Sequence, residues 1–138
     1  MSQTVLPSLR HPLLAAMDAV GSGLTAAVDA DCWPLSDAEV GQLLDEIDVA
    51  EARLAAVKLT AVAEADRRGP GRADGAPSTA GWLRQRHLTH PGAAASTVAL
   101  AGALDRHCQG TAAALAGGRL SAGHAQVIVA TLAALPPV

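Results

Sequence analysis

Residues 36–68 read SDAEVGQLLDEIDVAEARLAAVKLTAVAEADRR, and this stretch predicts one long helix. It opens with a capping box, in which the side chains of Ser36 and Glu39 each accept a hydrogen bond from the other residue's backbone N–H. The helix is expected to end at Arg68, before Gly69, because a basic last turn followed by glycine is typical of a helix C-terminus. Apolar residues recur between these ends with alternating spacings of three and four, at Val40, Leu43, Ile47, Ala50, Leu54, Val57 and Ala61.

This spacing is that of a coiled-coil seam, and it leaves two alternatives for what the seam contacts. In one, the helix packs only against a first helix predicted from Pro12 to about Ala30, so that residues 1–68 form a long antiparallel hairpin. In the other, the seam pairs with a second copy of the chain, because a rod of about 48 Å has more seam than a 19-residue helix can cover. The candidate self-association residues are Leu43, Ile47, Leu54 and Val57.

Composition predicts an all-α protein. Half of the 138 residues are apolar, and most of these are alanine and leucine, whereas Phe and Tyr are absent. Alanine and leucine favour helices, while the missing aromatic residues favour strands. The expected organisation is a hairpin over residues 1–68, a loop over 69–77, and a compact set of short helices over 78–138, all within one folding unit.

Four short helices are predicted after the loop, the first two in an order like that of a helix-turn-helix. Ser78 or Thr79 caps the first, and Thr89 or His90 with Pro91 opens the second. The second helix is expected to turn Ala95, Val98, Ala101 and Leu104 inward, a third lies near residues 111–116, and Ser121 caps the last, which runs to Leu135. The last helix is apolar on nearly every side and is therefore expected to be buried, by these helices, by a partner, or by further chain.

Charge is unevenly distributed along the chain, although the net charge is only −3. Residues 1–66 hold eleven acidic and three basic residues, whereas residues 67–124 hold seven arginines and two aspartates. The basic half indicates a surface for a polyanion such as DNA, unless its arginines are merely solvated at helix ends. The candidate phosphate-binding residues are Arg84, Arg86, Arg106 and Arg119. Residues 93–97 (AAAST) offer few side chains that could read bases, so any DNA binding is expected to be weak or non-specific.

No catalytic residue, metal site or cofactor is predicted. His87 and His90 have a spacing that could suit a metal, but the helix is expected to end before His90. A serine cap followed by a histidine in the first helical turn accounts for Ser121 and His124. Neither a signal peptide nor a membrane span of about 20 apolar residues is recognisable, and a cytoplasmic protein with reduced cysteines is expected.

The run Gly118-Arg119-Leu120-Ser121-Ala122-Gly123-His124-Ala125, together with Gly75–Leu83 and Val98–Leu104 before it, resembles the family called domain of unknown function 222. This family is typical of actinobacterial proteins, including the thirteen-E-twelve repeat type, and commonly precedes a C-terminal HNH endonuclease domain. The same run is similar to the end of the DNA-binding region in ParB-type partitioning proteins. The resemblance therefore implies association with DNA.

The resemblance carries no nuclease residues to this sequence. HNH chemistry needs asparagine, and the chain contains none. It is therefore expected to correspond to the N-terminal part of such a protein, truncated relative to the family. The resulting hypothesis is a non-catalytic helical module that assists DNA association. The alternative is a structural or dimerisation module, or a truncated remnant, without affinity for DNA.

Overall fold

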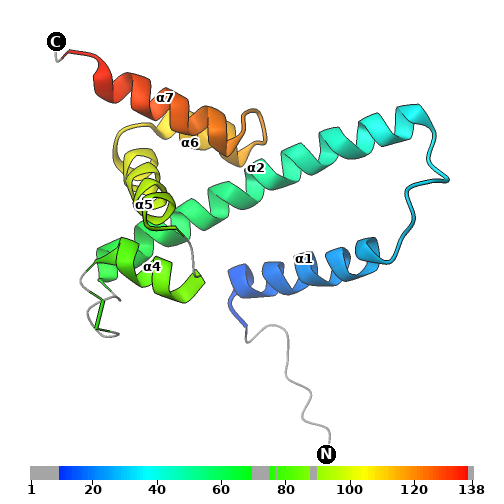
Figure 1. Ribbon diagram of the computed structural model, residues 1–138, viewed down its shortest axis with the longest axis horizontal. Coiled ribbons are helices and arrows are strands. Elements are labelled where there is room, and N and C mark those ends of the chain that lie inside the picture. Colours follow the sequence, from blue (N-terminus) through cyan, green and yellow to red (C-terminus); the bar gives the residue numbers. More distant parts are fainter. Residues whose placement is uncertain (1–9, 70–74, 77, 88–89, 137–138) are drawn as a thin grey trace, which may run out of the picture. The chain divides into compact units, whose positions relative to one another are not determined.

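A computed structural model describes the chain except for residues 1–9, 70–74, 77, 88–89 and 137–138. The described residues form six helices and no strand, which confirms the all-α prediction (Figure 1). The chain divides into two compact units, Met1–Val40 and Gly41–Val138. The predicted loop over residues 69–77 and the turn at residues 88–89 lie largely outside the described residues.

The first unit contains helix α1, Pro12–Val28. Pro12 occupies the first helical turn, where its missing N–H costs nothing, and His11 caps the helix by accepting a hydrogen bond at Nδ1 from the backbone N–H of Leu13, at 3.1 Å. Arg10 forms an ion pair with Asp18 at 3.0 Å. No residue of α1 is buried. The antiparallel hairpin with the next helix remains a prediction.

Helix α2, Asp37–Arg68, is the predicted long helix. The expected capping box is present: the backbone N–H of Ser36 donates to Glu39 Oε1 at 3.0 Å, and that of Glu39 donates to Ser36 Oγ at 3.1 Å. The helix ends at Arg68, and Gly69 follows with φ of 65°. This left-handed conformation favours glycine and explains the stop.

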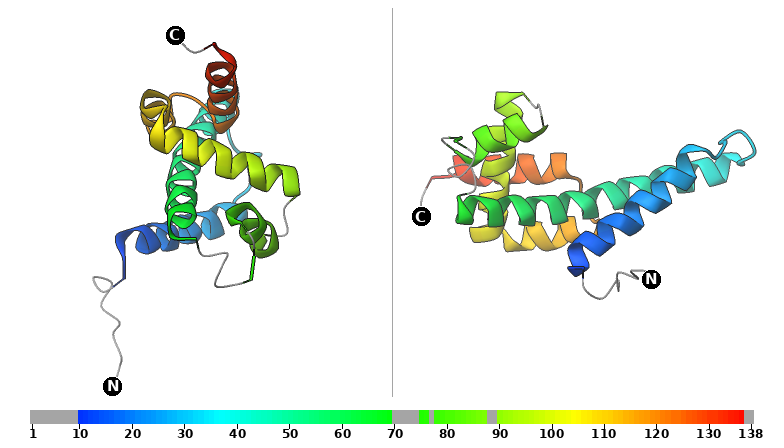
Figure 2. Two further views of the ribbon diagram at one scale, coloured as in Figure 1. Left: turned by 90° about the vertical axis from the view of Figure 1, so that its left-hand side faces the viewer. Right: turned by 90° about the horizontal axis from the view of Figure 1, so that it is seen from below.

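Helices α4 (Thr79–His87), α5 (Pro91–Arg106), α6 (Gln109–Ala116) and α7 (Ala122–Ala134) complete the second unit. Figures 1 and 2 show them gathered around the C-terminal half of α2, while the turns of α2 that follow Gly41 extend beyond them. The predicted caps are confirmed: Ser78 Oγ accepts from the backbone N–H of Gly81 at 3.1 Å, and His90 Nδ1 accepts from that of Gly92, also at 3.1 Å.

The core of the second unit combines leucines with small apolar side chains. Its buried members are Ala52, Leu59, Val62, Leu83, Ala94, Leu100, Ala101, Leu104, Leu115 and Ala125. Four of these ten residues are alanines, and their small side chains let the backbones of the helices approach closely. The expectation that Ala95 points inward is wrong, because Ala95 is exposed and its neighbour Ala94 is buried, whereas Ala101 and Leu104 are buried as expected.

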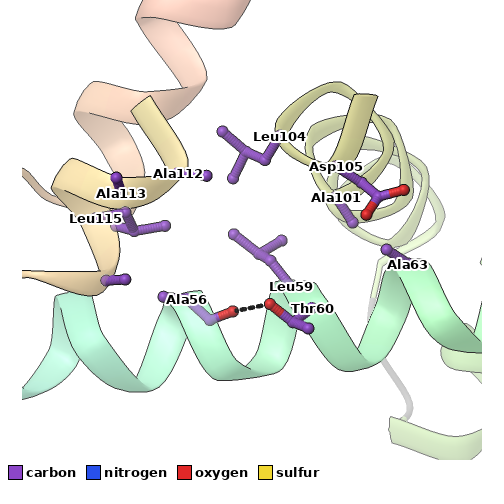
Figure 3. Close-up of a pocket in the computed structure, with 11 residues that line it drawn as sticks. Ala56, Leu59, Thr60, Ala63, Ala101, Leu104, Asp105, Ala112, Ala113 and Leu115 are labelled. Carbon is purple, nitrogen blue, oxygen red and sulfur yellow. Dashed lines mark hydrogen bonds between the residues drawn. The ribbon is translucent and has the colours of Figure 1, made fainter. Parts of the chain in front are cut away.

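Two polar contacts fasten the C-terminal end of α2 to its neighbours. Thr79 Oγ1 donates to Asp66 Oδ1 at 2.6 Å, and Arg67 lies 3.7 Å from Asp105 of α5. Between α2, α5 and α6 lies a cleft of about 350 Å³, in which the side chains of Leu59, Leu104 and Leu115 point toward one another (Figure 3). This cleft continues the apolar core toward solvent.

The last helix is much less buried than its composition suggests. Ala125 is its one buried residue, whereas Val127 is 65% exposed and Leu132 is 50% exposed. Of the three alternatives for what buries α7, burial by the other helices of the chain is therefore wrong. The contacts of α7 with α5 and α6 cover only one side of it.

Candidate functional site

Helix α2 has two apolar faces that point in roughly opposite directions. The first contributes Ala52, Leu59 and Val62 to the core. The second is the predicted seam, and its four candidate residues are partly exposed: Leu43 36%, Ile47 43%, Leu54 44% and Val57 37%. Since each residue turns the helix by about 100°, Leu54 and Leu59 lie about 140° apart around its axis. The short helices of the second unit therefore pack on the face of α2 that points away from the seam.

Charged residues flank the seam along its length. Glu46, Glu51, Arg53 and Lys58 are all exposed, and no ion pair within the described ranges involves them. Positions beside a seam are where charges select a coiled-coil partner and its orientation. The seam with its flanking charges is therefore the first candidate interaction surface.

Two of the four predicted phosphate-binding arginines lie together. Arg84 and Arg86 are exposed in the last turn of α4. The guanidinium carbon of Arg86 lies 5.4 Å from the ring centre of Trp82, within the range of a cation–π contact. No ion pair in the described part of the chain neutralises either arginine. These two arginines are the second candidate surface.

The other two arginines lie elsewhere in the second unit. Arg106 is the last residue of α5, about 22 Å along that helix from Pro91, the end that follows α4. Its guanidinium folds back over Gly102, where an added Cβ would lie 2.6 Å from Nη2. Arg119 lies in the loop between α6 and α7 and lines a cleft beside α2. The four arginines therefore do not form one patch.

Helix α5, which follows the arginines of α4, has few groups for reading bases. Its exposed residues near the N-terminus are Gly92, Ala93, Ala95 and Ser96, and only the serine has a polar side chain. Asn, Gln or Arg would be needed for bidentate contacts with base edges. The helix-turn-helix-like arrangement of α4 and α5 remains a prediction, and the described residues favour contact with phosphates over sequence reading.

The run Gly118–Ala125 has a structural role that the sequence only partly indicated. Gly118 has φ of 73°, and an added Cβ would lie 2.6 Å from Val49 Cγ1, so the loop between α6 and α7 can lie against α2 only with glycine there. Leu120 packs against the core and Ala125 is fully buried. The close approach to α2 depends on tertiary packing, and the two adjacent glycines were its only signal.

Ser121 and His124 form a helix cap, as predicted. Ser121 Oγ accepts from the backbone N–H of His124 at 3.1 Å, and His124 Nδ1 is the acceptor for the backbone N–H of Ser121, at 3.4 Å. The two side chains also approach to 3.0 Å. With both groups engaged at the start of α7, their proximity is accounted for by capping.

A cleft of about 630 Å³ lies between this cap and α2. Asp48 and Glu51 line it from α2, and Arg119 and His124 line it from the opposite side. The lining charged residues are all exposed. Sequence reasoning did not foresee this cleft, because its two walls lie about 70 residues apart in the chain.

Two carboxyl groups of α2 are perturbed by hydrogen bonds. The backbone N–H and the side chain of Ser36 hold the pKa of Glu39 below its ordinary value of 4.5. The Arg68 guanidinium, which donates to Glu64 at 2.7 Å, lowers the pKa of Glu64, and Arg67 adds to the effect despite some desolvation. Both groups lie near the ends of α2, and neither lines the two clefts described above.

Among the described residues, no group of three or more His, Cys, Asp or Glu side chains is placed to hold a metal ion. The predicted end of α4 before His90 is confirmed, since that helix stops at His87. Cys32 and Cys108 are both free thiols. No helix in the described ranges is long and apolar enough to cross a membrane.

Comparison with known proteins identifies a family. The model of a family described as a domain of unknown function, DUF222, matches residues 41–138. The matched range coincides with the second compact unit, Gly41–Val138. No curated protein and no solved structure matches the chain.

Proposed function

This chain belongs to the DUF222 family, whose description names no activity, and we propose that it is a non-catalytic helical module that associates with copies of itself through the seam of α2. The proposal is carried by the exposure of that seam. Leu43, Ile47 and Leu54 follow a coiled-coil spacing, yet each keeps more than a third of its surface exposed.

The position of the core supports this proposal. A helix with one apolar stripe normally uses it to pack on its own domain. Here the domain packs on the opposite face, through Leu59 and Val62, and the larger side chains of the seam are left at the surface. Exposed contiguous apolar surface commonly marks a site of protein association.

The non-catalytic part of the proposal rests on what the polar groups already do. Ser121 and His124 cap a helix, Thr79 and Asp66 fasten α4 to α2, and Glu64 pairs with the arginines at the end of α2. The free thiols of Cys32 and Cys108 suit the cytoplasm, where cysteines remain reduced, and we place the module there.

Light scattering of the Leu54→Asp variant tests the proposal. A carboxylate in the seam should abolish association, because it would have to be desolvated at the interface. The fold should persist, since Leu54 is 44% exposed and lies off the core face. Gln42→Asp, an exposed change on the same helix away from the seam, is the matched control and should leave the mass unchanged. Equal masses for the native chain and Leu54→Asp would reject the seam as an interface.

A second candidate function, weak contact with DNA phosphates through α4, is favoured by the exposed Arg84 and Arg86, which form no ion pair with any residue that the structure describes. Pairing with an HNH endonuclease domain in an actinobacterial protein, which the family resemblance implies, would bring such a surface close to DNA. Arg86 is oriented by its contact with Trp82, so its guanidinium is partly ordered before it binds.

Two double variants of equal charge test this candidate. We measure the slope of the logarithm of the binding constant for a random-sequence duplex against the logarithm of the salt concentration. In Arg84→Ala/Arg86→Ala this slope should be smaller by about two, because two fewer counterions are released on binding. Arg106→Ala/Arg119→Ala, which removes the other two predicted arginines, should leave the dependence nearly unchanged, because those residues lie elsewhere in the unit. Equal effects of the two variants would show that only net charge matters.

A further inference from the structure

We propose that the seam of α2 binds α2 of a second copy in the antiparallel orientation, with the two-fold axis passing between Asp48 and Val49. This inference rests on the proposed self-association and adds the partner segment, its direction and its register. It follows from the charges that flank the seam and from the sizes of the side chains along it.

The seam fixes the coiled-coil positions of every residue on α2. With Ile47 and Leu54 at position a, Leu43, Ala50 and Val57 take position d. Glu46 and Arg53 then occupy position g, while Glu51 and Lys58 occupy position e. The core residues Ala52, Leu59 and Val62 fall at positions b and f, away from the seam. The core of the second unit therefore lies on the side of α2 away from the seam.

A parallel pair in register would bring like charges together. In that orientation each g residue meets the e residue five positions later on the partner. Glu46 would face Glu51 of the second copy, and Arg53 would face Lys58 of the second copy. Symmetry repeats each contact, so every flanking pair along this part of the seam would be repulsive.

An antiparallel pair brings opposite charges together, because g residues then face g residues. In the register centred between Asp48 and Val49, Glu46 faces Arg53 of the second copy, and two-fold symmetry repeats the pair. Glu46 and Arg53 are exposed and take part in no ion pair with the described residues, so in each copy both side chains can form these contacts.

The same register also matches the sizes of the apolar side chains. Leu43 faces Leu54 of the second copy, and Ile47 faces Ala50 of the second copy, so a large side chain lies opposite a small one at the centre. Leu43 and Ile47 precede Val49, where the α6–α7 loop contacts α2, and Ala50 and Leu54 are exposed although the core residue Ala52 lies between them in the sequence. The register therefore satisfies the charges and the packing together.

Disulfide cross-linking between full-length chains tests the orientation. In a background of Cys32→Ser and Cys108→Ser, chains carrying Leu43→Cys are mixed with chains carrying Leu54→Cys. Light scattering first measures whether the mixed chains form dimers. The mixture is then mildly oxidised. The antiparallel pair predicts disulfides between the two kinds of chain, identified by mass spectrometry of the linked peptides. Asp45→Cys, exposed on the same helix but off the seam, is the control and should not cross-link.

The outcomes distinguish the antiparallel orientation from self-association itself. Dimers with cross-links only between Leu43→Cys and Leu54→Cys chains support the proposal. Dimers in which Leu54→Cys chains link to one another overturn the orientation but keep self-association. Monomers, as expected if α1 of the same chain occupies the seam, overturn both. Dimers that form no cross-link at these positions overturn the seam as the interface and keep self-association through another surface.

Charge exchange gives an independent check without cysteine. Glu46→Arg should raise the dimer dissociation constant about tenfold, because it turns two attractive contacts into repulsive ones. The double variant Glu46→Arg/Arg53→Glu should return it to within about threefold of the native value, since the pair is restored in reverse. A double variant no tighter than Glu46→Arg alone would overturn the pairing.

Discussion

The two apolar faces of α2 differ in how regular their sequence pattern is and in whether the core of the second unit covers them. The seam face carries large residues in strict coiled-coil spacing, and Leu43, Ile47 and Leu54 remain partly exposed. The opposite face carries mostly alanines, yet Ala52, Leu59 and Val62 are buried in the core. The comparison teaches that the most regular apolar pattern on a helix need not be the one that its own domain covers.

The largest expected effect comes from removing a large side chain from each face. Leu59→Ala should lower the free energy of unfolding by about 3 kcal/mol, because it empties a site that is only 7% exposed. Leu54→Ala should lower it by less than about 1 kcal/mol when measured in dilute protein, where association contributes little. Urea unfolding of the two variants measures the difference. Equal losses would mean that both faces are covered within one chain.

Gly118→Ala should have the next largest effect, because it disturbs the contact between the α6–α7 loop and α2. The added Cβ would lie 2.6 Å from Val49 Cγ1, and φ of 73° is strained for alanine. A loss of about 2 kcal/mol in unfolding free energy is expected. Gly117→Ala is the matched control, because that residue has φ of −83° and its added Cβ would meet mainly the flexible end of Arg119. A larger loss for the control would contradict this account of the loop.

Acidification should weaken the N-terminal cap of α2. The pKa of Glu39 is lower in the folded chain than in the unfolded chain, because the folded carboxylate accepts the Ser36 backbone N–H. Its stabilisation is therefore fully present above the ordinary value of 4.5 and is lost as the pH falls through the lower folded value. Circular dichroism should show a smaller acid-dependent loss of helix in Glu39→Gln, which keeps the acceptor but does not titrate. Identical pH profiles would remove Glu39 from the cap.

The smallest expected effect concerns α7. Val127 is 65% exposed, so Val127→Ser should change the free energy of unfolding by less than about 0.5 kcal/mol. The buried residue on the same helix, Ala125, is fully covered, and Ala125→Ser should be the more damaging change because it places a hydroxyl in the core. Thermal unfolding of both variants tests this ranking. A large loss for Val127→Ser would indicate that α7 is covered in solution.

Local signals in the sequence predicted the elements of the fold well. Ser36 with Glu39, Ser78, Pro91 and Ser121 each marked a helix start that the structure confirms. Such signals depend on side-chain hydrogen bonds and backbone conformation within one or two turns, which a sequence records directly. Helix ends were predicted to within about two residues for the same reason.

Burial was predicted less well, because it depends on which helices meet. The choice of Ala95 over Ala94 as an inward residue failed in an alanine-rich helix, where neighbouring residues have the same hydropathy. The apolar character of α7 indicated a buried helix, but Ala125 is its one buried residue and Val129 is only partly covered. The separation of Arg106 from Arg84 and Arg86 could not be foreseen either, because it follows from the length and packing of α5.

The most direct test of the central claim is the mass of the native chain in solution, measured by sedimentation equilibrium over a wide range of concentration. The account predicts an average mass that rises with concentration toward twice that of one chain, because the seam of α2 finds its partner in a second copy. The Leu54→Asp variant should remain at the mass of one chain throughout. A native mass that stays at that of a single chain at every concentration would contradict the account.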